Sequence, residues 1–228
     1  MSSRIYFTFP ITLLKDRQLT DIRTLCDDIM NYCGYKEAIR QGGTIENRMK
    51  KAGEMLGITW GDCQSNFDRG RSLANSTPRR TPMTSINHDR IFDFYDNYKS
   101  DFEIITFLAF AGIRSILQMK PYTRVTNDYL IVRMAGYNTT NCIEDVPPHI
   151  KKYNTRYKLD KIKSELQNNW HMKLYGKCTH GFYVSFKLSL NQLVKAVESK
   201  REVNLKAKRQ DEIRQALKEF ETELKTTP

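Results

Sequence analysis

The sequence predicts a mainly α-helical fold with a small amount of β-structure. Apolar residues recur at helical spacing through most of the chain, alternating patterns are short, and Ser or Thr residues stand where helices should begin. A chain of 228 residues is long enough for one or two compact domains. We expect three parts: residues 1–85, 86–188 and 189–228.

The first part, residues 1–85, should be a helical region with one β-strand. Residues 4–9 alternate between apolar and polar side chains, which indicates a half-buried strand. Helical spacing then begins after Thr20, which fits an N-cap. A shorter helix is expected over residues 46–56, with Gly57 as its stop signal.

The helical pattern fades between residues 60 and 80, where only Phe67 and Leu73 offer apolar anchors. Residues 77–82, with the sequence TPRRTP, are predicted to connect two subregions.

The second part should contain a buried central helix. Residues 86–98 supply a dense aromatic face at helical spacing, which is typical of core packing. Ser100 and Glu103 then form a capping-box pattern, which predicts a helix from Asp101. Residues 104–117 are apolar on nearly every side, so neighbouring elements should bury this helix.

Another helix should begin at Thr126, a good N-cap, and end at Gly136, which can adopt the left-handed conformation. Residues 137–153 are expected to be a surface loop. The next helix, residues 155–169, should bury Leu159, Ile162 and Leu166 along one face.

Alternation resumes after Trp170 and predicts a β-hairpin over residues 171–187. Its two strands should be linked by the segment from Gly176 to Gly181. The tip would carry small and basic side chains, which suit a phosphate backbone or a minor groove.

In this order, residues 101–187 resemble a winged-helix DNA-binding domain, of the kind found in regulators and replication initiators of phages and plasmids. The matching features are a buried first helix, a capped second helix ending in glycine, a basic third helix and a hairpin wing. One departure is the segment 137–153, which is longer than the turn usual in that family between the second and third helices.

The resemblance implies that the third helix enters the major groove of duplex DNA, while the wing contacts the backbone or the minor groove. Asn and Lys side chains can pair with adenine and guanine edges, respectively. The residues expected to contact DNA are Lys151, Lys152 and Arg156 before or at the start of the helix, Lys158, Lys161, Ser164 and Asn168 on its outer face, and Lys177, Thr179 and His180 at the wing.

The third part, residues 189–228, should be one long helix. Four apolar residues near its end are spaced by four, three and four, which is a heptad pattern: Ile213, Leu217, Phe220 and Leu224. This seam favours either a homodimer or docking on the body of the protein.

The charge distribution favours an anionic partner. The formal net charge is +11, and residues 151–228 hold 18 of the 37 Lys and Arg residues but only nine of the 26 acidic ones. The longest apolar run is too short to span a bilayer, and the five cysteines form no regular framework. We expect free thiols and a soluble, cytoplasmic protein with no membrane contact.

These patterns predict a non-catalytic protein that binds double-stranded DNA without a cofactor or metal, as a transcriptional regulator or replication initiator of a mobile element. One alternative is a protein-interaction adaptor whose basic helix serves only solubility. A second alternative is a metal-dependent nuclease that uses Asp89, Asp93, Asp96 and Asp101, because three of these carboxylates recur on one helix face. Nucleotide-hydrolysis and serine-nucleophile motifs are absent from the sequence.

Overall fold

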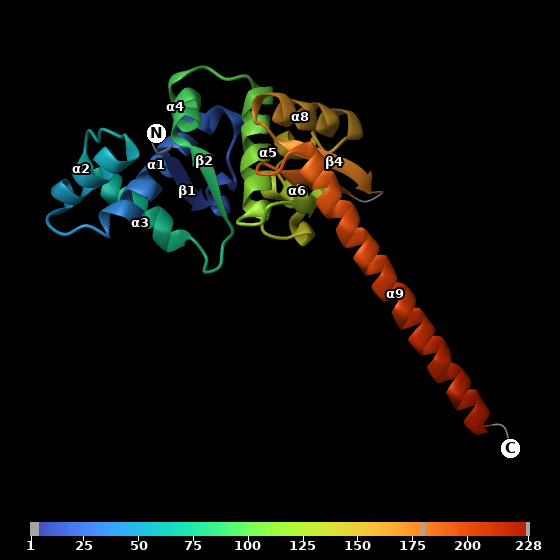
Figure 1. The fold of residues 1–228 in the computed structure, drawn as a ribbon. Helices are drawn as coiled ribbons and strands as arrows, with labels where there is room; N and C mark the ends of the chain where they lie inside the picture. The colour runs from blue at the N-terminus through green and yellow to red at the C-terminus, as the bar shows by residue number, and fades with distance from the viewer. Residues whose placement is uncertain (1–4, 179–180, 227–228) are drawn as a thin grey trace.

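The computed structural model describes residues 5–178 and 181–226, with side chains described except at 177–178 and 219–226. Over these residues the fold is mainly helical with two small antiparallel sheets, as the sequence predicts (Figure 1). The α-helices are α1 (Ile22–Ala38), α2 (Ile45–Leu56), α3 (Cys63–Ser76), α4 (His88–Asp96), α5 (Asp101–Leu117), α6 (Asn127–Met134), α7 (Pro148–Lys151), α8 (Arg156–Asn169) and α9 (Leu190–Thr226). The strands are β1 (Tyr6–Pro10), β2 (Met83–Asn87), β3 (Thr123–Val125), β4 (Lys173–Cys178) and β5 (Gly181–Ser185). Short 3-10 helices lie at Ile11–Leu14, Leu19–Asp21 and Thr140–Cys142.

The first sheet joins two segments that are far apart in the sequence. β1 and β2 pair antiparallel, with Pro10 opposite Met83. Phe7 and Ile86 are fully buried on its inner face. The expectation of a single strand in residues 1–85 was wrong, because β2 begins within this range and continues past its end. The pairing supplies backbone hydrogen bonds that a short polar strand cannot obtain locally.

α3 occupies most of the segment in which the helical pattern fades. The Asp62 side chain accepts a hydrogen bond from the backbone N–H of Ser65 and so caps the helix. Its buried residues are Phe67, Gly70 and Leu73. Because so few apolar side chains suffice to bury its inner face, the helix shows little periodicity in the sequence.

The beginning of α1 also differs from the expectation. Thr20 is not its N-cap, because a 3-10 helix at Leu19–Asp21 precedes α1 directly. The expected aromatic helix over residues 86–98 is shorter, because residues up to Asn87 belong to β2. Tyr98 lies beyond its end and is exposed.

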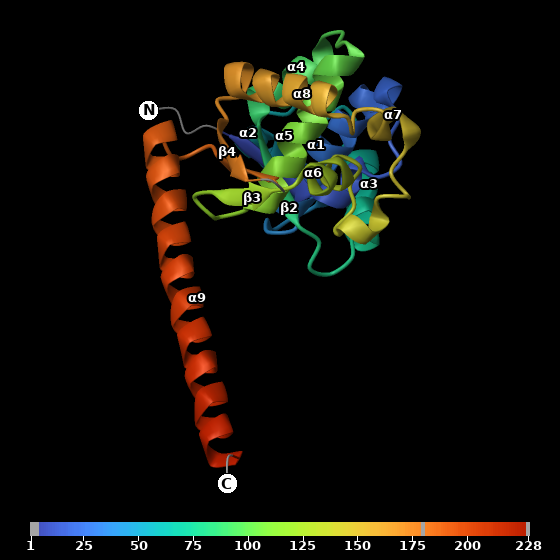
Figure 2. The same ribbon diagram turned by 90° about the vertical axis from the view of Figure 1, so that its right-hand side faces the viewer.

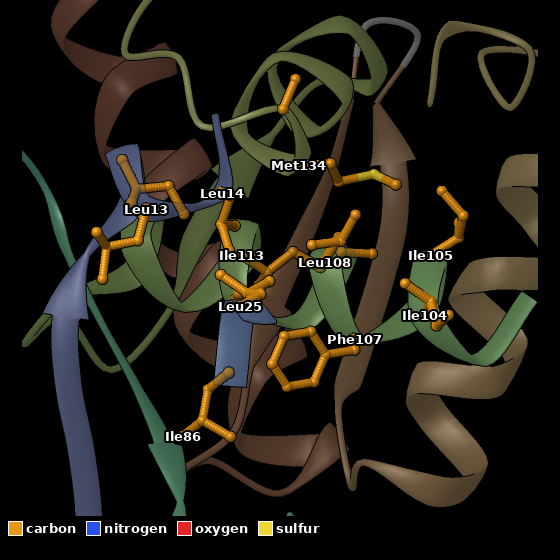
Figure 3. Close-up of a cluster of buried hydrophobic side chains, with 14 of the residues drawn as sticks. Leu13, Leu14, Leu25, Ile86, Ile104, Ile105, Phe107, Leu108, Ile113 and Met134 are labelled. Atoms are coloured by element: carbon orange, nitrogen blue, oxygen red, sulfur yellow. The ribbon is translucent and has the colours of Figure 1, made fainter. Parts of the chain in front are cut away.

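α5 is the buried central helix that the sequence predicts. Ser100 and Glu103 form the expected capping box, in which the Ser100 backbone N–H donates to Glu103 Oε2 at 2.9 Å. Figure 1 shows α5 between the N-terminal helices and the second sheet. Figure 3 shows side chains from several elements converging on it, including Leu25, Ile86 and Met134. One continuous core therefore includes residues from both sides of the expected boundary at residue 85.

The segment after α5 holds the second helix of the expected order. Thr126 caps α6 by accepting a hydrogen bond from the Tyr129 backbone N–H. Gly136 follows with φ +81°, and an added Cβ would lie 2.6 Å from the Lys15 backbone nitrogen. The position therefore favours glycine both for its conformation and for the close approach. The expected loop over residues 137–153 contains a 3-10 helix and the short α7.

The second sheet has the strand order β3-β5-β4. The hairpin of β4 and β5 was predicted, whereas β3 was not. Figure 2 shows α9 leaving the body beside this sheet and projecting far beyond it. Leu193 and Val197 in its first turns are buried, while residues 199–218 are exposed. Across the described ranges, no helix combines the length and apolar character that a membrane span requires.

Four cysteines are free thiols, as the sequence predicts: Cys26, Cys33, Cys63 and Cys142. Burial raises the pKa of Cys26 and of Cys33 to about 12. These two thiols therefore stay protonated at neutral pH and act as small apolar side chains in the core.

Candidate nucleic-acid interface

α8 is held by its apolar face and by a side-chain cap. The Thr155 hydroxyl accepts a hydrogen bond from the backbone N–H of Lys158. Leu159, Ile162 and Leu166 are buried, as predicted, and the helix packs against α5. The opposite face of α8 is therefore free of the core.

That outer face carries the cationic and amide side chains that the sequence singled out. Figures 1 and 2 show α8 on the outside of the body. The exposed residues predicted to contact DNA on this helix are Arg156, Lys158, Lys161, Ser164 and Asn168. Asp160 is also exposed, and its carboxylate lies 3.3 Å from Lys163 Nζ.

The C-terminal end of α8 is anchored by contacts that are distant in sequence. Arg90 on α4 donates a hydrogen bond to the Asn169 carbonyl at 3.0 Å, and its guanidinium lies 4.9 Å from the Trp170 ring centroid. A cation at this end is favourable because helix carbonyls there are otherwise unpaired. His171, at φ +57°, then turns the chain directly into β4. The role of Arg90 could not be predicted from the sequence, because only the tertiary contact with Trp170 reveals it.

Two outer-face lysines are held over aromatic rings. Lys158 Nζ donates to the Lys152 carbonyl at 2.9 Å and lies 5.5 Å from the Tyr153 ring centroid. Lys161 Nζ lies 4.8 Å from the Phe102 ring centroid. Among the described residues, neither ammonium group is paired with a carboxylate. Both charges remain available to an external anion.

The residues before α8 differ in their surroundings. Lys152 is exposed, whereas Lys151 is half-buried in α7 and its Nζ lies 2.5 Å from Glu144 Oε2. A phosphate contact by Lys151 would have to compete with this carboxylate. Ser164 donates its hydroxyl to the Asp160 carbonyl within the helix, leaving its lone pairs outward.

The hairpin follows α8 and contacts it. Lys163 Nζ lies 4.5 Å from the Phe182 ring centroid, which links the helix to β5. The backbone of Lys177 belongs to β4, but its side chain lies outside the described set. Thr179 and His180, which the sequence places at the tip, lie outside the described residues. The two strands of the hairpin, β4 and β5, lie within the expected range of residues 171–187.

Asp93, the central carboxylate of the nuclease alternative, is already engaged with other groups. Asp93 accepts hydrogen bonds from Lys99 at 2.7 Å and from Asn97 at 3.0 Å, and the Lys99 bond lowers the pKa of Asp93 below its usual value. Within residues 5–178 and 181–226, no three His, Cys, Asp or Glu side chains are grouped so as to hold a metal ion. The geometry lends this alternative no support.

Comparisons with protein-family models, with curated proteins and with solved structures found no match to this chain.

Proposed function

We propose that this protein binds double-stranded DNA without catalysing a reaction, using the outer face of α8 and the β4–β5 hairpin. The observation that carries the proposal is the division of α8 into a buried apolar face and an exposed face rich in Lys, Arg, Ser and Asn. An α-helix fits the major groove, where such side chains can hydrogen-bond to base edges.

The roles of individual residues follow from their chemistry. Lys152 and Arg156, at the N-terminal end of α8, suit the phosphate backbone, which cations bind irrespective of sequence. Lys158, Lys161 and Asn168 lie further along the helix and suit base edges. The Lys163 contact with Phe182 supports a fixed geometry between helix and hairpin.

The resemblance to winged-helix regulators supports a role in transcriptional control or replication initiation of a mobile element. The structure has an additional feature consistent with that order of elements, because β3 lies between the first and second helices and pairs with β5. We place this activity in the cytoplasm, where free thiols such as those of Cys26 and Cys33 persist.

A salt series with duplex DNA tests the proposal. The variant Lys158→Ala/Lys161→Ala should bind random-sequence duplex about tenfold more weakly than the wild type at low salt. A plot of log affinity against log salt concentration should have a shallower slope for this variant. The change in slope should correspond to the loss of about two phosphate contacts. Fluorescence anisotropy with a labelled duplex measures both quantities.

Lys36→Ala/Lys51→Ala is the matched control, because it removes two exposed lysines on α1 and α2. Its affinity should stay within about twofold of the wild type. An equal loss of duplex affinity in the two double variants would mean that DNA binding depends only on the net charge of the protein. No duplex binding at low salt would overturn the proposal and favour the protein-interaction alternative.

We also propose that α9 joins two copies of the chain. Ile213 and Leu217, two residues of the predicted heptad seam, are exposed on the part of α9 that projects from the body (Figure 2). Val203, also exposed, falls on the same series of three- and four-residue steps, which continues through residues 206 and 210. The side chains of Phe220 and Leu224 lie outside the described set.

A further inference from the structure

A cavity of about 510 Å³ lies between the second sheet and α9, away from α8. Figure 2 shows β3 on the side of the body that faces α9, whereas α8 runs along the top. The polar lining residues that matter most are Lys120, Tyr122, Arg124, Tyr183, Lys200 and Arg201. Four of these side chains are cationic, and none of the described residues that line the cavity is Asp or Glu.

One face of α9 builds one wall of this cavity. Val197, Lys200, Arg201 and Asn204 line it, and these positions lie on a single helical face. Leu193 and Val197 on the preceding turns are buried against the body. The helix thus continues its packing face with cations instead of apolar residues, at the point where it still borders β3.

The opposite wall brings two further cations toward them. Lys120 precedes β3 and Arg124 lies within it. Among the described residues, no carboxylate is paired with Lys120 or Lys200. Arg201 is already paired, because its guanidinium lies 3.2 Å from Glu198. Gathering like charges around one cavity is unfavourable unless an anion offsets their repulsion.

Two tyrosines add an aromatic surface to the cavity. Binding of a simple inorganic anion would not require such a surface. The rings of Tyr122 and Tyr183 are half-buried, with centroids 6.3 Å apart. The Tyr122 hydroxyl lies 3.5 Å from the Ala196 carbonyl on α9, which places this ring at the junction of the two walls. Aromatic faces beside cations are the combination that binds bases and phosphates of unpaired nucleotides.

We infer that this cavity binds a nucleoside phosphate, with the base or sugar against the tyrosine rings and the phosphate oxygens on the lysine and arginine side chains. A volume of about 510 Å³ is within the range of small-molecule sites. The ligand can be a free nucleotide or the unpaired strand of a nucleic acid, which share this chemistry. The inference does not depend on duplex binding by α8.

Binding of three probes to the full chain tests the inference: ATP, a labelled ten-nucleotide oligo-dT and inorganic tripolyphosphate. In Lys120→Glu/Lys200→Glu, affinity for whichever nucleotide probe binds the wild type should fall at least about tenfold. Lys36→Glu/Lys51→Glu makes the same charge change elsewhere on the surface and should alter it less than about threefold. Circular dichroism checks that each variant is folded.

Tyr122→Ala separates nucleoside recognition from simple charge attraction. It should weaken the nucleotide probe about tenfold, because a base-stacking surface is lost, and leave tripolyphosphate binding unchanged. Binding of ATP alone identifies a free nucleotide as the ligand, and binding of oligo-dT alone identifies an unpaired strand. Lys158→Ala/Lys161→Ala should leave ATP affinity unchanged, so failure of duplex binding is distinguishable.

Three results would overturn the inference. In the first, no nucleotide probe binds the wild type at low salt. In the second, Lys36→Glu/Lys51→Glu weakens binding as much as the cavity variant does. In the third, Tyr122→Ala changes nucleotide and tripolyphosphate affinities equally, which would indicate an unspecific anion site.

Discussion

Asp28 on α1 is a buried carboxylate that joins two arginines from other segments, with only 3% of its side chain exposed. Arg69 on α3 binds it in a bidentate manner, with Nε 2.7 Å from Oδ1 and Nη2 2.8 Å from Oδ2. Arg17 contacts the second oxygen from the segment between β1 and α1. These charge-assisted hydrogen bonds are the stronger kind, and here they fix α3 against α1.

Replacing this carboxylate should be costly. Asp28→Asn keeps the volume but removes the charge, so we expect a loss of about 2 to 3 kcal/mol in the free energy of unfolding. The control Asp68→Asn breaks an ion pair with Arg71 at the surface, where the Asp68 side chain is 43% exposed. It should lower the free energy of unfolding by less than about 1 kcal/mol. Urea unfolding measures both values. Equal losses would show that the buried ion pair contributes no more than an exposed one.

At the scale of elements, the start of α5 should make stability depend on pH. Hydrogen bonds from the Ser100 hydroxyl and backbone N–H lower the pKa of Glu103 below its ordinary value of 4.5. Because the folded-state pKa is the lower one, this stabilisation is present above about pH 4.5 and is lost as the pH falls through the folded-state pKa.

Glu103→Gln should flatten part of that dependence. Glutamine can still accept the hydrogen bond of a capping box but carries no titrating proton. We expect the free energy of unfolding to fall less steeply for this variant than for the wild type as the pH drops from about 5.5 to about 3. Urea unfolding at a series of pH values measures the two slopes, and identical slopes would contradict the prediction.

The elements that could be predicted are those with local signals. α5 and α6 have side-chain caps next to their first residues, and α8 also has a continuous apolar stripe. The structure confirms all three. The exposed positions of the candidate DNA-contacting residues on α8 could likewise be predicted, because the buried stripe determines which positions face outward.

The missed elements depend on partners elsewhere in the chain. α3 lies so close to α1 that an added Cβ at Gly70 would be 2.2 Å from the Asn31 carbonyl oxygen. Gly70 and the Asp28–Arg69 ion pair form much of the contact between α3 and α1. Apolar side chains at helical spacing, which a sequence pattern would reveal, are therefore few in α3. β2 and β3 are short, and their pairing with β1 and β5 involves residues far along the chain. The cavity beside β3 was missed for the same reason.

At the scale of the whole molecule, α9 reaches about 55 Å if its 37 residues are regularly helical. Its residues 205–218 are exposed, and an isolated helix gains little stability without packing (Figure 1). Residues 200–209 hold five basic residues and one acidic residue, whereas residues 211–223 hold five acidic and two basic residues. Antiparallel pairing of two copies would bring opposite charges together and place the two bodies at opposite ends.

The prediction is that the wild type is a dimer and that Ile213→Lys/Leu217→Lys is a monomer. Lysines in the seam would place unpaired charges between the helices. The control is Leu205→Lys, because Leu205 is 56% exposed, similar to the 61% of Ile213, but lies off the seam. Sedimentation equilibrium at several protein concentrations measures the mass, and the control should remain dimeric. A monomeric wild type, or equal dissociation in the control, would contradict pairing through this seam.

Because the body and the cavity walls are unaltered, the monomeric variant should keep its cavity ligand and should lose duplex affinity only where two α8 helices bind one DNA molecule.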